Sequence, residues 1–153
     1  MGMNLKRKLL LISFVTILLV AILHYYALKL SWYWAYRWSD IPIHILGGFW
    51  ISLTALWASL EIGHIDRITG YKRKAMIVML SCVILGGVVW EVFELVANIT
   101  NVSFIGYWSD TLGDISSGFL GGLIAYSYFT KTKKGKPVEC SKYHVVCALG
   151  NPA

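Results

Sequence analysis

The sequence predicts an all-α fold, a polytopic membrane protein built as a four-helix transmembrane bundle. Three observations lead to this prediction: the composition, the lengths of the apolar stretches and the placement of the cations. Of the 153 residues, 57% are apolar and 14% are charged, whereas about a quarter of an average soluble domain is charged. This composition indicates a chain that lies largely within a bilayer.

Four stretches have the length that a helix needs to cross a bilayer, since about 20 mostly apolar residues span the hydrocarbon. They are residues 9–28, 41–60, 75–97 and 112–130. The connections between them are short, so consecutive helices are expected to pack as antiparallel neighbours, with no room for a soluble catalytic module. We therefore expect one transmembrane domain over residues 1–136 and a short cytoplasmic tail over residues 137–153.

The first apolar stretch is expected to be a retained helix and not a cleaved signal peptide. It follows a basic segment, as a signal core does, but its apolar run exceeds the roughly 7 to 15 residues of such a core. Its exit through Tyr25, Tyr26 and Lys29 offers no cleavage site with small residues.

The cations predict the orientation. All but two of the 14 Lys and Arg residues fall on one side of the predicted bundle, and the exceptions are Lys29 and Arg37. Because cytoplasmic loops are enriched in cations, both termini are expected in the cytoplasm, an N-in, C-in topology. The net charge of +6 then reflects topology and attraction to membrane lipids, and it does not indicate nucleic-acid binding. We expect a multi-pass protein of a bacterial or archaeal cytoplasmic membrane, that is, a cell inner membrane.

Most of the acidic residues lie in or at the ends of the predicted helices. A carboxylate at a helix centre costs at least ~2.5 kcal/mol, so such residues normally face the bundle interior and serve a function. Spacings of three or four residues place each pair on one helix face. The helix directions put all members in the outer leaflet, where three helices are expected to converge. The set consists of Asp40, His44, Glu91, Glu94, Asp110 and Asp114.

These six residues are the candidate ligands of a divalent metal ion. Five carboxylates and one imidazole cannot all ionise in a low dielectric unless a cation compensates them, and no Lys or Arg lies within these motifs. Hard oxygen ligands suit Mg²⁺, Mn²⁺ or Ca²⁺, and the imidazole also admits Zn²⁺. The sequence does not distinguish among these metals.

Three functions are compatible with such a site, and the sequence does not decide whether the protein is an enzyme. In the first, the metal serves binding or lipid-directed hydrolytic chemistry on a lipid-linked substrate, with Glu94 as candidate general base. In the second, the acids belong to a proton or cation transporter subunit. In the third, they form a structural polar network with hydroxyl groups such as those of Tyr107 and Thr111.

Three further features lie outside the acidic set: a histidine, a pair of cysteines and a stripe of small residues. His24 is expected to be an interfacial histidine, with a place in the site as the alternative. Cys140 and Cys147 in the tail are expected to be plain thiols, because their spacing fits zinc sites poorly. A stripe of small residues predicts close packing of the last helix. The stripe consists of Gly113, Ser117, Gly121 and Ala125.

Three motifs in order contain the polar set. They are Asp40-Ile-Pro-Ile-His44 followed by Gly48-Phe49, then Glu91-Val-Phe-Glu94, then Trp108-Ser-Asp110-Thr111-Leu-Gly-Asp114. In these motifs, over roughly residues 35–125, the chain resembles the uncharacterised bacterial inner-membrane family typified by YjdF. It is more distantly similar to VanZ-like membrane proteins. Pro42 and Ile43 stand where a basic residue and small residues are usual in the first family. The resemblance implies that the polar set is a family pattern, and it implies no established reaction.

Overall fold

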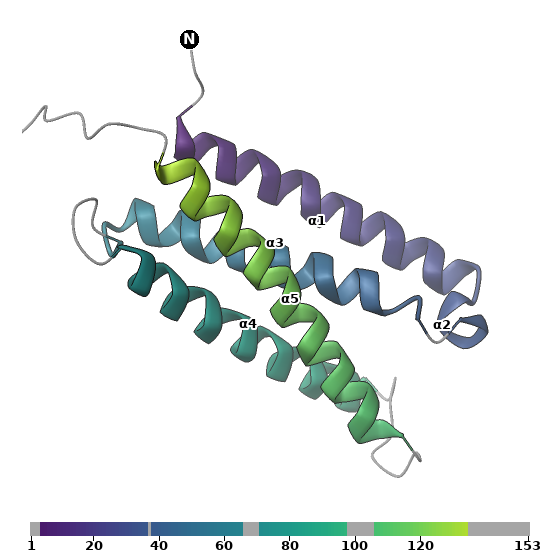
Figure 1. Ribbon diagram of the computed structural model, residues 1–153. Coiled ribbons are helices and arrows are strands. Elements are labelled where there is room, and N and C mark those ends of the chain that lie inside the picture. Colours follow the sequence, from purple (N-terminus) through teal and green to yellow (C-terminus); the bar gives the residue numbers. More distant parts are fainter. Residues whose placement is uncertain (1–3, 37, 66–70, 98–105, 135–153) are drawn as a thin grey trace, which may run out of the picture.

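The computed structural model describes residues 4–36, 38–65, 71–97 and 106–134, and the described chain consists of helices and the turns between them. The helices are α1 (Leu5–Lys29), α2 (Trp32–Ala35), α3 (Ile41–Glu61), α4 (Tyr71–Val96) and α5 (Tyr107–Lys134). The four long helices form a bundle, and α2 is a single turn in the connection between α1 and α3 (Figure 1). The predicted all-α, four-helix fold is confirmed. The tail over residues 137–153, with Cys140 and Cys147, lies outside the described residues.

The long helices differ in how apolar they are. Among the described residues, α1, α3 and α4 are long and apolar enough to cross a membrane. At 28 residues, or about 42 Å, α5 is long enough as well. It contains Asp110, Asp114 and several hydroxyl groups, and it does not reach the same apolar composition. The helix predicted over residues 112–130 is therefore present, with a more polar surface than the other three.

The central element is α3, because α1, α4 and α5 each pack against it. Its most extensive contact is with α5, which crosses it running in the same direction (Figure 1). The two backbones approach most closely at glycines. A Cβ atom on Gly48 would collide with the backbone of Gly118, and one on Gly121 with the backbone of Ile45. An added Cβ on Gly113 would meet nothing within 4 Å, so the packed stripe of α5 does not include Gly113.

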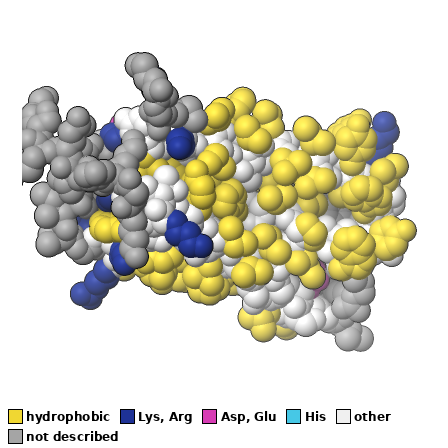
Figure 2. Space-filling view, turned by 45° about the horizontal axis from the view of Figure 1, so that its top comes forward, with side chains coloured by type: hydrophobic (Ala, Val, Ile, Leu, Met, Phe, Trp, Pro, Cys, Tyr) yellow, Lys and Arg dark blue, Asp and Glu magenta, His cyan; other side chains and the backbone are white. Residues whose placement is uncertain are grey.

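One end of the bundle is basic. We call it the basic end, where α1 begins, α3 ends, α4 begins and α5 ends (Figure 1). Lys6 Nζ lies 2.9 Å from Glu61 Oε2 and ties α1 to α3, and Lys133 Nζ lies 4.3 Å from the centroid of the Tyr71 ring and ties α5 to α4. The Lys and Arg side chains in view gather there, and the exception is at the far end (Figure 2). This arrangement matches the one-sided placement of cations that the sequence predicts.

The packed core lies toward the basic end. Its fully buried members include Leu9, Leu53, Leu56 and Phe129. By contrast, the outward faces of α1 and α4 expose many large apolar side chains, and apolar side chains cover much of the face in view in Figure 2. Such faces are costly in water and favourable in lipid. The acidic residues of the polar set lie toward the other end of the bundle.

The start of α5 sets the positions of its acids. Gly106 adopts a φ of 118°, a conformation that favours glycine. Its carbonyl oxygen accepts hydrogen bonds from the Asp110 backbone N–H at 3.0 Å and from the Ser109 hydroxyl at 2.8 Å. As a result, α5 begins at Tyr107, well before the apolar stretch predicted from residue 112, and Asp114 lies within its third turn.

Candidate functional site

The first turn of α3 provides two residues of the site. Pro42 lies at the start of the helix, where its missing N–H costs nothing. Asp40 occupies the N-cap position, where an aspartate side chain usually accepts a hydrogen bond from a backbone N–H of the first turn. Here the side chain makes no such bond. Its Oδ1 atom instead lies 3.3 Å from Nε2 of His44, one turn further along.

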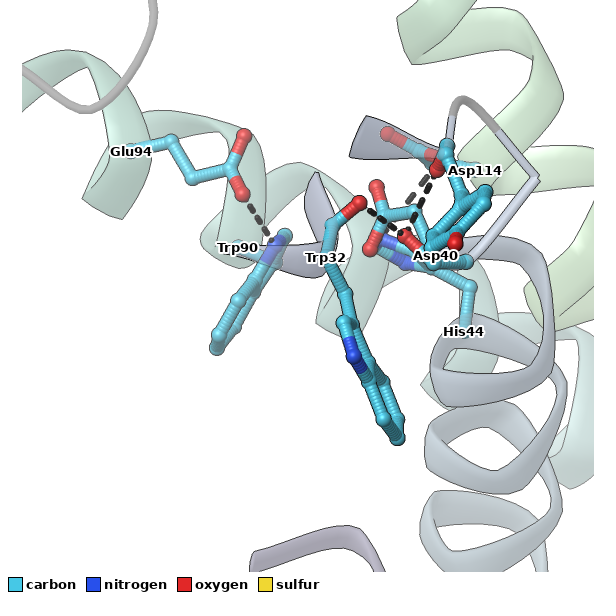
Figure 3. Close-up of polar contacts among 8 residues, drawn as sticks. Trp32, Asp40, His44, Trp90, Glu94 and Asp114 are labelled. Carbon is cyan, nitrogen blue, oxygen red and sulfur yellow. Dashed lines mark hydrogen bonds and ion pairs between the residues drawn. The ribbon is translucent and has the colours of Figure 1, made fainter. Parts of the chain in front are cut away.

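The third residue comes from α5. Oδ1 of Asp114 lies 3.5 Å from the same Nε2 atom of His44, as Figure 3 shows. The candidate ligand atoms of Asp40, His44 and Asp114 all lie within 4.8 Å of one another. We call these three residues the Asp/His cluster. His44 and Asp114 have side-chain exposures of 15% and 12%, while that of Asp40 is 30%, so the cluster is shielded on the His44 and Asp114 side and partly open at Asp40.

The cluster geometry suits a cation. An imidazole nitrogen holds at most one proton, so Nε2 of His44 cannot donate a well-aligned hydrogen bond to two carboxylates at once. Nitrogen and oxygen ligands bind a zinc-like ion at ~2.0–2.2 Å, which places tetrahedral neighbours ~3.4 Å apart. The observed separations are 3.3 and 3.5 Å. These two separations match part of a metal coordination sphere, and the ligand oxygens of Asp40 and Asp114 lie within 4.8 Å of each other.

Glu91 lies beside the cluster with partners of its own. Its Oε2 atom accepts a hydrogen bond from the Thr111 hydroxyl at 3.0 Å and from the Tyr107 hydroxyl at 3.4 Å. These are hydroxyl groups that the structural-network hypothesis named. Glu91 is also among the acidic neighbours of Asp114. It therefore joins α4 to α5 next to the cluster.

Glu94 is held by a tryptophan. Nε1 of Trp90 donates a hydrogen bond to Glu94 Oε1 at 2.8 Å (Figure 3). The Trp90 ring also lies between two imidazoles, with its centroid 6.3 Å from that of His24 and 6.3 Å from that of His44, edge-on in both pairs. Sequence reasoning did not single out Trp90. The available signal was its spacing of four residues from Glu94, which places both on one helix face.

The structure thus separates the six predicted ligands into two sets. Asp40, His44 and Asp114 come together, and among the described residues Glu91, Glu94 and Asp110 do not belong to that group. Asp110 is exposed in the first turn of α5, one turn before Asp114. It is still an acidic neighbour of Asp114, so the surroundings of the cluster are strongly acidic.

The family described as "Predicted membrane protein (DUF2238)" matches residues 3–135. The chain belongs to this family. The matched region includes all three motifs of the polar set and is consistent with the resemblance to the YjdF-type family. No curated protein and no solved structure matches the chain. Membership of the DUF2238 family supports a membrane protein, and the activity has to be inferred from the site.

In this DUF2238 protein, a cavity of about 320 Å³ adjoins the Asp/His cluster. All four long helices contribute to its lining. Its polar lining residues are His44 and Asp114 of the cluster, together with Glu91 and His24, and the remainder is apolar, aromatic or glycine. His24 was expected to be an interfacial residue, and it lines this cavity and contacts Trp90.

Proposed function

We propose that this membrane protein binds a divalent cation through Asp40, His44 and Asp114, and that the cation serves binding or lipid-directed hydrolytic chemistry at the outer leaflet. The observation that best supports the proposal is the convergence of two carboxylate oxygens on one imidazole nitrogen. Two aspartates also balance the charge of a divalent cation, so the loaded site is neutral and inexpensive to hold in a shielded position.

The neighbouring residues support a chemical role. A divalent ion in this position activates water or polarises an ester or phosphate oxygen. We assign Glu94 as the general base, because Trp90, whose ring contacts that of His44, restrains its carboxylate. Glu91 is assigned a positioning role, since its two hydroxyl partners hold it beside Asp114.

A transporter is the less favoured alternative. It would need a polar path that continues from the cluster to the basic end. Between His44 and Glu61, α3 contains no ionisable side chain. Farther from the cluster, the hydroxyl groups of Ser13 and Thr54 are bonded to each other at 2.6 Å. A site open at one end of the bundle therefore fits these residues better than a pathway through it.

Elemental analysis of the purified protein tests the proposal. We expect about one divalent ion per wild-type chain and a substantial loss of it in Asp114→Asn, since an amide is a poorer ligand than a carboxylate. Asp110→Asn is the matched control, because Asp110 lies one turn earlier on the same helix and outside the cluster. It should retain the metal. Wild-type protein that holds no metal after preparation with each candidate ion would refute the proposal.

A further inference from the structure

The cavity beside the Asp/His cluster is elongated and has two different ends. Its lining on α3 runs from Ile43 to Ile51, about 12 Å along the helix axis. At one end lie the cluster, Glu91 and Trp90, and at the other lie Ile17 of α1 and Val83 of α4. The cavity therefore leads from a polar site into an apolar channel along the bundle.

One glycine of the lining, Gly47, faces open space in the cavity. A Cβ atom added to Gly47 would meet no heavy atom within 4 Å, so the space beside α3 is open there. The walls come from α1 and α4, which each pack on α3 and are bridged at the polar end by the contact of His24 with Trp90. Ala21 and Trp90 are exposed at the rim, so the cavity opens at the side of the bundle, between faces that are themselves apolar.

We infer that this cavity binds one hydrocarbon chain of an anionic lipid, with an oxygen of the lipid headgroup at the Asp/His cluster. The volume of about 320 Å³ lies at the low end of the range for ligand sites, roughly 300–1,000 Å³, and suits a single chain. Aliphatic walls without hydrogen-bonding groups favour a hydrocarbon. The lateral opening admits a ligand from the bilayer. The headgroup contact rests on the proposed cation, which would attract an anionic oxygen.

An anionic headgroup at the polar end depends on the cation. Without a bound cation, the acidic residues there would repel an anion. A cation held by the three cluster residues would keep coordination positions for a phosphate or carboxylate oxygen and so offset this repulsion. Lys29, on α1 beyond His24, adds positive charge at that end of the bundle. The hydrocarbon chain and the headgroup of the lipid therefore have separate, adjoining binding sites.

Photo-labelling tests the inference. The protein is placed in vesicles of phosphatidylethanolamine and phosphatidylglycerol that contain a lysophosphatidate with a diazirine in its chain, and labelled positions are mapped by mass spectrometry. We expect labels on cavity residues such as Ile17, Ile51 and Val83. Unlabelled lysophosphatidate should compete for these positions, and glycerol phosphate, which has the headgroup without the chain, should not.

Two glycine variants give a matched pair. Gly47→Leu places a side chain in the cavity, and Gly113→Leu places the same side chain in open space outside it. In Gly47→Leu, the new side chain should exclude about two methylenes of the lipid chain, which should lower cavity labelling roughly tenfold. In Gly113→Leu, cavity labelling should be unchanged. Equal labelling of Gly47→Leu and wild type would overturn the inference. So would wild-type labels spread over the exposed faces of α1 and α4, a result that does not depend on either variant.

Metal content measured on the same samples separates this inference from the proposed function. Removal of the metal by a chelator should lower cavity labelling, because the headgroup loses its partner. Metal-loaded wild-type protein without cavity labels would overturn the lipid inference alone. Wild-type protein without any metal would refute the proposed cation site whatever the labelling shows.

Discussion

Asp40 does not make the contact that its position favours. A side chain that caps a helix typically contributes about 1 kcal/mol, and Asp40 at the start of α3 makes no such bond. It contacts His44 instead. The backbone of Asp40 is itself helical, with φ −77° and ψ −37°, whereas a capping residue typically has an extended backbone. The helical backbone therefore accounts for the missing cap bond.

At the same residue scale, the rise in thermal stability that a bound metal produces should depend on His44. An ion at a hundredfold excess over its dissociation constant adds about 2.7 kcal/mol, which corresponds to a rise in Tm of roughly 5–10 °C. We expect this rise with one or more of Mg²⁺, Mn²⁺, Ca²⁺ and Zn²⁺ in detergent, and its loss in His44→Gln. His24→Gln is the control, because His24 also packs on Trp90 but lies outside the cluster. An equal loss in both variants would contradict the assignment.

The metal-dependent rise in Tm should also depend on pH. Metal ligands must be deprotonated, so protons compete with the ion and release it as the pH falls. The stabilisation is therefore expected in full near pH 8 and should decline toward about pH 5, where histidine is ordinarily protonated. Thermal melts with and without metal across this range measure it. A rise that is constant over the range would contradict ligation by His44.

Two variants on α4 test whether Glu94 is a ligand of the metal or only lies near the metal site. Trp90→Phe removes the indole N–H and should lower stability by about 0.5–1.5 kcal/mol, the usual contribution of one hydrogen bond. Glu94→Gln keeps an acceptor for Trp90 and should change stability little. Both should retain the metal, because Glu94 lies outside the cluster. Loss of bound metal in Glu94→Gln, by elemental analysis, would restore the wider ligand set that the sequence predicts.

At the scale of elements, the site depends on how closely α3 and α5 approach. Gly48→Ala should lower stability by about 1–3 kcal/mol through overpacking, because its Cβ would meet the backbone of Gly118. It should also weaken metal binding, since separation of the helices moves Asp114 away from His44. Gly113→Ala is the control, and it should be neutral or slightly stabilising because alanine favours helices more than glycine does. Denaturation and metal titration of both variants measure these effects.

The sequence predicted helices better than it predicted contacts. Apolar length alone located the four long helices, and a spacing of four residues correctly paired Asp40 with His44. The same rule placed Asp110 beside Asp114, yet only Asp114 reaches His44. Periodicity defines a helix face, whereas the acid that reaches the site depends on where α5 crosses α3. Thr111 and Trp90 bind Glu91 and Glu94; the sequence indicated Thr111 as a possible partner of the acids, but not which acid it would bind.

At the scale of the whole molecule, charge and polar chemistry lie at opposite ends of one bundle. The basic end contains the contacts of Lys6 with Glu61 and of Lys133 with Tyr71, while the Asp/His cluster lies where α3 begins (Figures 1 and 3). If cations mark the cytoplasmic side, the cluster faces the outer leaflet, where lipids from that leaflet can enter the cavity.

Labelling of single cysteines in intact cells tests this orientation and the crossing of α5 together. In a background without native cysteines, Lys29→Cys and Ser109→Cys should react with a membrane-impermeant maleimide, because both positions are exposed at the cluster end. Lys72→Cys and Lys131→Cys, exposed at the basic end, should react only after permeabilisation. Reaction of positions 109 and 131 on the same side would show that the more polar α5 does not cross. Reaction of position 72 from outside would invert the bundle and place the cluster in the inner leaflet.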